Sequence, residues 1–260
     1  GAITVAEALS HQGGVPGFPD PIDPDMWLDP PALSAALARL KPMWGRGEGS
    51  GYHPLTWSYI AGELVRRVSP RSLGAILRED VCEPLGIDFW IGLPASEHAR
   101  VAQMMKPKEP TQFGQRNDAL RAAFLTPWAA ANRGGAEWRS VEIPSANGHG
   151  TAPATARLYS AYALKGRIGE TRVIAPVTWD ELTRERVSGK DRILPGEVAF
   201  LVVAFLFCLS FLMCCCPALM SASACLRTWL RTRAAHASST RSISASSPRR
   251  ATAEHGPASA

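Results

Sequence analysis

Histidine and cysteine are the residues of this chain that could hold a metal ion, and their spacing does not favour one. None of the six histidines lies at ligand spacing from another histidine or from an acidic residue. Five of the six cysteines fall in or beside one apolar run, and no Cys-x-x-Cys pair occurs. We therefore predict no metal and no other cofactor, and we interpret the remaining Cys82 as a small buried residue of a helix. The histidines, each interpreted as a surface or loop residue, are His11, His53, His98, His149, His236 and His255.

Nucleophilic catalysis has recognisable sequence signatures, and two of them are missing from the 260 residues. No Gly-x-Ser-x-Gly sequence occurs, and no serine is followed three residues later by a lysine. The glycines of residues 45–51 lack the spacing of a phosphate-binding loop. Tyr52 follows them directly. Taken alone, it is interpreted as a loop tyrosine that packs at the start of a helix.

Apolar residues at helical spacing predict the elements that would position these groups. Two capping boxes, Thr4–Glu7 and Thr178–Glu181, each indicate a helix start. The Gly-rich residues 44–51 are predicted as the loop that delivers Tyr52 to the next helix. The predicted helices are 5–10, 30–40, 56–69, 72–83, 152–165 and 177–187, and the predicted short strands are 88–93 and 98–103.

The positive charge of the chain belongs to its last 40 residues. Residues 221–260 hold six arginines and one acidic residue, whereas residues 1–220 hold 22 basic and 22 acidic residues. Because residues 1–220 have no net charge, their electrostatics do not favour binding to nucleic acid. Residues 221–260 are rich in Ser, Ala, Thr and Arg, a composition that predicts disorder.

Residues 198–220 form an unbroken apolar run without a charged residue. About 20 apolar residues span a bilayer as a helix, so the composition predicts a single transmembrane helix. The arginines that follow would place residues 221–260 in the cytoplasm. The alternative is that residues beyond about 197 are translated non-coding sequence. In that case residues 198–220 do not anchor the protein in a membrane, and a cytoplasmic location is the alternative.

Four segments, in the same order, resemble the β-lactamase-related serine hydrolases, which include class C β-lactamases, penicillin-binding-protein-like peptidases and esterases. The resemblance covers about residues 1–197 and implies a β-lactamase/transpeptidase-like α/β sandwich. The matching segments are Ile3–Pro16, Trp44–Glu63, Cys82–Pro94 (CEPLGIDFWIGLP) and Pro144–Tyr159.

The resemblance implies a catalytic role for Tyr52, whose counterpart is the general base that relays a proton from the serine nucleophile. A phenol with a pKa of about 10 needs a nearby lysine ammonium before it can accept a proton near neutral pH. Position three of the family's Tyr-x-Asn motif is Pro54 here, which favours an esterase-like or peptidase-like member over a true β-lactamase.

Two other family motifs are not found. The family places Ser-x-x-Lys before the segment that Ile3 begins, so it would precede Gly1. His149-Gly150-Thr151 imitates the third motif, but it lies where the family has the segment before a helix. We therefore interpret His149 as a loop residue.

These observations favour a fragment of a serine hydrolase that acts on esters or amides through an acyl-enzyme, inactive alone because it lacks the nucleophile. The alternative is a single-pass membrane protein with a non-catalytic β-lactamase-like binding module; a helical piece without independent function is a third. The predicted fold is mainly α with a few short strands, the helical part of the sandwich, plus a C-terminal hydrophobic helix. The predicted parts are 1–197, 198–220 and 221–260.

Overall fold

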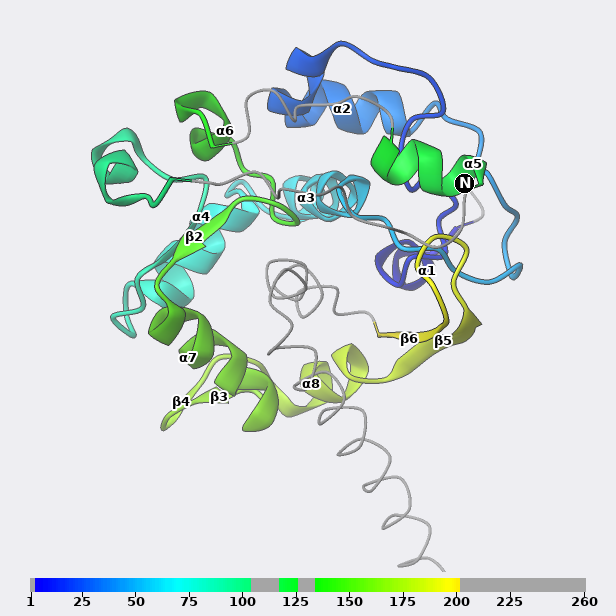
Figure 1. Ribbon diagram of the computed structural model, residues 1–260. Coiled ribbons are helices and arrows are strands. Elements are labelled where there is room, and N and C mark those ends of the chain that lie inside the picture. The colour runs from blue at the N-terminus through cyan, green and yellow to red at the C-terminus, as the bar shows by residue number, and fades with distance from the viewer. Residues whose placement is uncertain (1–2, 104–116, 126–133, 202–260) are drawn as a thin grey trace, which may run out of the picture. The chain divides into compact units, whose positions relative to one another are not determined.

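The computed structural model describes residues 3–103, 117–125 and 134–201 (Figure 1). These residues are mainly helical with a few short strands, as the sequence predicts. The strands pair in three two-stranded antiparallel sheets. The α-helices are α1 (Val5–Leu9), α2 (Pro30–Leu37), α3 (Thr56–Val68), α4 (Leu73–Leu77), α5 (Asp118–Leu120), α6 (Ala136–Ser140), α7 (Ala152–Ala163) and α8 (Pro176–Leu182). The 3-10 helices are η1 (Pro24–Leu28) and η3 (Ala95–Arg100), and the π-helical turns are η2 (Arg78–Cys82) and η4 (Arg121–Leu125). The strands are β1 (Phe89–Ile91), β2 (Gly148–Gly150), β3 (Arg167–Ile168), β4 (Thr171–Arg172), β5 (Glu185–Lys190) and β6 (Glu197–Leu201).

The starts of the helices follow from local capping chemistry. The predicted capping box opens α1: the Glu7 amide donates to Thr4 Oγ1 at 3.2 Å, and the Thr4 amide donates to Glu7 Oε2 at 2.8 Å. Pro30 begins α2 after Asp29, whose side chain accepts the Ala32 amide at 3.0 Å. These contacts satisfy amides that have no partner within the helix itself.

Four groups of buried side chains hold the described residues together, and the smallest of them is Trp57 with Ala61 of α3. One joins α2 and α3, and a second joins β1 to α7 and includes the buried Cys82, as predicted. The third group surrounds Tyr52 and therefore positions the site. It consists of Trp44, Tyr52, Leu120, Ala123, Ile193 and Phe200.

One predicted strand is wrong, and one predicted helix is shorter than predicted. Residues 98–103 do not form a strand, because the chain turns into the 3-10 helix η3 directly after Pro94. The helix predicted over 177–187 is α8, which ends at Leu182. It begins at Pro176 with Ala175 as its N-cap, which makes no side-chain cap, so the predicted capping box from Thr178 does not open it.

Residues 185–201 form a hairpin instead, drawn in yellow in Figure 1. In its register Ser188 faces Ala199 and Gly189 faces Val198, and an irregularity lies between Glu185 and Val187. The first residues of the predicted hydrophobic helix, 198–201, are thus part of strand β6. The remainder of that prediction, residues 202–220, and the predicted tail 221–260 lie outside the described residues.

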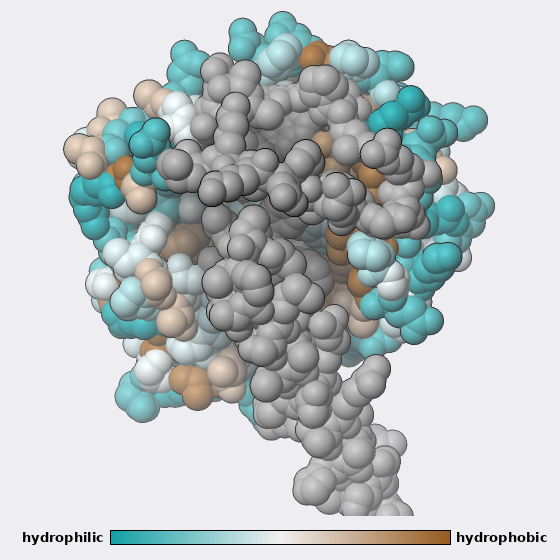
Figure 2. Space-filling model, in the orientation of Figure 1, coloured by the Kyte–Doolittle hydropathy of each residue, from teal (hydrophilic) through white to brown (hydrophobic). Residues whose placement is uncertain are grey.

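One face of the described part is largely polar where its residues are coloured in Figure 2. On the face drawn in Figure 2, most of the coloured residues are hydrophilic, with isolated apolar residues between them. None of the described helices combines the length and the apolar character that crossing a membrane requires. The large hydrophobic side chains that are exposed are Ile3, Val5, Val68, Leu164 and Val177.

Candidate active site

Tyr52 lies in the loop before α3, as predicted, and its side chain is buried with 3% of its surface exposed. Its ring meets the ring of His11 edge-on, with the centroids 5.2 Å apart. The preceding Gly51 lets Trp44 approach closely, because a Cβ on Gly51 would lie 2.7 Å from the indole. A bulkier residue there would push Trp44 or the backbone of Tyr52 out of place.

The carboxylate of Asp191 holds the backbone of Tyr52 from the side of the β5–β6 hairpin. Asp191 Oδ1 accepts three amides, from Tyr52 at 3.3 Å and from Ile193 and Leu194 at 2.7 Å each. Its Oδ2 is buried and has no hydrogen-bond partner among the described residues. Burial raises the pKa of Asp191, and the three amides act in the opposite direction. Asp191 was not predicted from the sequence, although an Asp at a hairpin end often accepts amides a few residues on.

His53 joins the loop of Tyr52 to the segment after α1. Its Nδ1 lies 2.6 Å from the Gly51 carbonyl oxygen, and its Nε2 lies 3.1 Å from the amide nitrogen of Val15. A carbonyl can only accept and an amide can only donate, so the neutral ring carries its proton on Nδ1. Burial lowers the pKa of His53 to about 4, and the contact with Gly51 opposes that shift.

His11 forms hydrogen bonds to the loop of Tyr52 through both its backbone carbonyl and its ring. The carbonyl accepts the Gly51 amide at 3.1 Å, and the ring atom Nδ1 accepts the His53 amide at 3.1 Å. Burial lowers the pKa of His11 well below its usual range, and the neighbouring His53 adds to that effect. His11 and His53 are thus loop residues as predicted, but both are buried, and their use as hydrogen-bond partners was not predicted.

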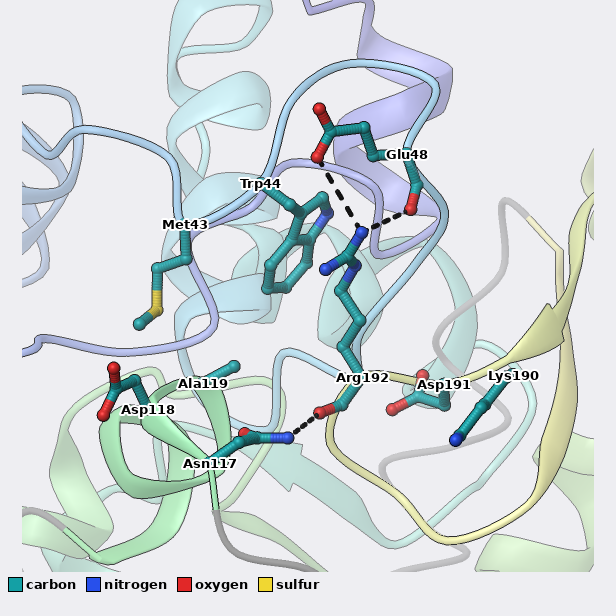
Figure 3. A pocket seen from close by; sticks show the side chains of 9 residues that line it. All are labelled: Met43, Trp44, Glu48, Asn117, Asp118, Ala119, Lys190, Asp191 and Arg192. Carbon is teal, nitrogen blue, oxygen red and sulfur yellow. Dashed lines mark hydrogen bonds and ion pairs between the residues drawn. The ribbon is translucent and has the colours of Figure 1, made fainter.

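A cavity of about 620 Å³ lies next to this network and shares Trp44 and Asp191 with it (Figure 3). The Arg192 guanidinium lies beside the Trp44 indole and donates to the Glu48 carbonyl at 2.8 Å. Asn117 donates to the Arg192 carbonyl at 2.9 Å. The lining therefore offers groups of both charges to a small polar molecule. It consists of Met43, Trp44, Glu48, Asn117, Asp118, Ala119, Lys190, Asp191 and Arg192.

His149 lies in strand β2, where it pairs with Trp90 of β1, and not in a loop as predicted. The side chain is partly buried, and burial lowers its pKa. Thr151 beside it is the N-cap of α7, its hydroxyl accepting the Ala154 amide at 3.2 Å. Across residues 3–103, 117–125 and 134–201, no cluster of three potential ligands suits a metal ion.

The low pKa of His53 predicts that acid weakens the fold. The unfolded chain binds a proton on this ring below about pH 6.5, whereas the folded chain does not bind it until about pH 4. The stabilisation is therefore complete above pH 6.5 and is lost as the pH falls towards 4. Between pH 7.5 and 5, we expect His53 alone to lower the free energy of unfolding by about 2 kcal/mol.

Urea unfolding at several pH values measures this slope, and His53→Gln is the matched control. Glutamine cannot titrate, so the variant should lose less stability over the same range. His11 adds to the slope of the wild type, whereas the raised pKa of Asp191 opposes it, because that carboxyl stabilises the fold on protonation. A wild-type chain and a Gln variant with equal slopes would contradict the assignment of His53.

The family model described as Beta-lactamase matches residues 1–207 of this chain. The chain belongs to the β-lactamase family. This confirms the family predicted from the four sequence segments, and with it a β-lactamase/transpeptidase-like fold of helices and short strands.

Relatives of known structure and sequence are esterases and penicillin-binding-protein homologues. The esterase/β-lactamase LipL of Mycobacterium tuberculosis is 32% identical over 198 residues, a match that covers 71% of this chain and 46% of LipL. A penicillin-binding protein homologue from Caulobacter crescentus is 52% identical, with a TM-score of 0.73 and coverage of 77% and 54%. A family VIII carboxylesterase is 36% identical, with a TM-score of 0.70 and the same coverage. The chain therefore spans about half the length of the relatives it matches.

Proposed function

We propose that this chain supplies the Tyr52-bearing half of a serine hydrolase that cleaves small esters or amides through an acyl-enzyme. Tyr52 is the general base: its phenolate oxygen takes the proton of the serine hydroxyl as the serine attacks the carbonyl carbon. The observation that carries this proposal is the position of Tyr52, which is buried and held through its backbone by Asp191. The resemblance of residues 44–63 to the family implies a tyrosine base at this point of the sequence.

The nucleophile of the proposed reaction comes from outside these residues, because no Ser-x-x-Lys sequence occurs among the 260. The family's lysine ammonium would lower the pKa of the Tyr52 phenol, so the base as well as the nucleophile depends on that motif. We therefore propose that the 260-residue chain does not hydrolyse esters by itself.

Esters are the preferred substrate class in this proposal. Pro54 stands where β-lactamases of the family have an asparagine, so position 54 offers no side-chain amide to the side chain of a β-lactam. A polar contact of this kind is worth about 1–3 kcal/mol when it is buried. The names of two relatives, an esterase/β-lactamase and a carboxylesterase, support an ester substrate.

A chimeric protein tests this proposal. In it, residues 1–201 replace the matched half of the Caulobacter crescentus homologue, whose other half supplies the Ser-x-x-Lys segment expected of the family. The 260-residue chain should not hydrolyse p-nitrophenyl butyrate, and the chimera should. For the chimera, kcat/KM for this ester should exceed that for a chromogenic cephalosporin by about 10-fold or more.

Pro54→Asn in the chimera is the matched variant for substrate class. It restores the missing amide and should raise cephalosporin turnover relative to ester turnover. A chimera that prefers the cephalosporin, with Pro54 in place, would contradict the ester assignment. If the 260-residue chain hydrolysed the ester by itself, and a substitution of Tyr52 did not reduce that activity, the proposal that the nucleophile lies outside the chain and the base is Tyr52 would be contradicted.

A further inference from the structure

The backbone of His11 has an unusual conformation. Its φ is +62°, in the left-handed region that L-residues adopt only at a cost in free energy. Among the described residues other than glycine, only His11 and Lys165 have a positive φ. Lys165 directly follows Leu164, the C-cap of α7, where such a conformation is common, whereas His11 is buried in the core beside Tyr52. Strain of this kind persists where the surrounding contacts require it.

The left-handed conformation allows one residue to reach the amides on both sides of Tyr52. The His11 carbonyl accepts the amide of Gly51, and the His11 ring accepts the amide of His53, each at 3.1 Å. We propose that His11 is a positioning residue, which fixes the backbone before and after Tyr52 and so holds the phenol in place for catalysis. The inference rests on the proposed role of Tyr52 as the base.

The two histidines must then be opposite tautomers. His11 Nδ1 accepts an amide, so a neutral His11 ring carries its proton on Nε2. His53 carries its proton on Nδ1, because Nδ1 faces the Gly51 carbonyl and Nε2 faces the Val15 amide. Each ring therefore has one fixed role: His53 makes contacts through both ring nitrogens, whereas His11 does so through Nδ1, its buried Nε2 having no hydrogen-bond partner among the described residues.

Two further contacts join the segment that holds His11 to the start of α3. The Trp57 indole Nε1 donates to the Leu9 carbonyl at 2.9 Å, and the Thr56 hydroxyl donates to the Val15 carbonyl at 2.7 Å. The residues on both sides of His11 are therefore anchored to the helix that follows Tyr52. A shift of His11 is transmitted to Tyr52 rather than absorbed by a free loop.

The tautomers can be measured on the 260-residue chain without any substitution. Imidazole ¹⁵N chemical shifts distinguish a protonated ring nitrogen from one that accepts a hydrogen bond. At pH 7 we expect His11 to show a protonated Nε2 and His53 a protonated Nδ1. Two histidines with the same tautomer would overturn the inference.

Two substitutions separate the hydrogen bond from the backbone conformation. Asparagine and glycine both tolerate a left-handed backbone, but only asparagine carries an acceptor, Oδ1, at the position of Nδ1. In His11→Gly, hydrogen exchange at the His53 amide should become about 10-fold faster relative to the amides of α7. In His11→Asn it should stay within about 3-fold of the wild type. Equal exchange at the His53 amide in the Gly variant and the wild type would overturn the inference.

Kinetics of the chimera separate a failure of this inference from a failure of the proposed function. His11→Gly should lower kcat about 10- to 100-fold with KM nearly unchanged, and His11→Asn should restore most of kcat. If Tyr52→Phe abolishes activity but His11→Gly does not lower kcat, the positioning role is wrong and the proposed function stands. If Tyr52→Phe leaves activity unchanged, the proposed function fails, and with it the catalytic meaning of the His11 contacts.

Discussion

In the chimera, Tyr52→Phe is expected to lower kcat for p-nitrophenyl butyrate about 100-fold or more, because the phenol oxygen is the proposed base. Phenylalanine keeps the buried ring and its edge-on contact with His11, so the packing around position 52 is preserved. Steady-state kinetics measure the effect, and KM is expected to change much less than kcat.

Tyr59→Phe is the matched control for this result. Tyr59 is also a buried tyrosine, and its hydroxyl donates to the Trp27 carbonyl at 2.5 Å within the α2–α3 core. Loss of that hydrogen bond should lower stability by about 1 kcal/mol and leave kcat within a few-fold of the unsubstituted chimera. Equal loss of activity in both variants would indicate general damage to the fold rather than loss of a base.

Asp191→Ala is expected to lower the free energy of unfolding of the 260-residue chain by about 2–4 kcal/mol. The substitution leaves three amides, those of Tyr52, Ile193 and Leu194, without their acceptor in a buried part of the molecule. Urea unfolding at pH 7 measures the change. The tip of the β5–β6 hairpin should also exchange its amide hydrogens faster, since Asp191 holds it.

Asp191→Asn separates the hydrogen bonds from the charge. Asparagine keeps Oδ1 as an acceptor and removes a buried negative charge whose second oxygen has no partner within the described part of the chain. We expect this variant to lie within about 1 kcal/mol of the wild type. If the Ala and Asn variants lose the same free energy of unfolding, the charge of Asp191 and not its hydrogen bonds stabilises the loop of Tyr52.

Local sequence signals predicted the elements that local chemistry determines. The Thr4–Glu7 capping box, the prolines at the start of α2 and the apolar spacing of α3 each act within a few residues, and the structure has those helices. The same kind of signal failed at Thr178, because Pro176 begins α8 earlier and the following residues pair with β6. Strand pairing depends on a partner elsewhere in the chain, which a local pattern does not include.

The candidate site was predictable only in part, for the same reason. Tyr52 could be found because it follows a Gly-rich loop in a segment that resembles a known family. His11 and Asp191 could not, since their roles arise from contacts across 42 and 139 residues of sequence. In sequence, a buried histidine and a hairpin aspartate look like ordinary loop residues. The φ of His11 and the three amides on Asp191 are visible only in the structure.

The rate of acyl-enzyme formation tests the central claim most directly. The chimera and its Tyr52→Phe variant would be mixed rapidly with p-nitrophenyl butyrate, quenched, and examined by intact mass for an acyl group on the serine of Ser-x-x-Lys. The account predicts that the adduct forms in the chimera and forms about 100-fold more slowly, or more slowly still, in the variant. Acylation at the same rate in both proteins would contradict the assignment of Tyr52 as the base.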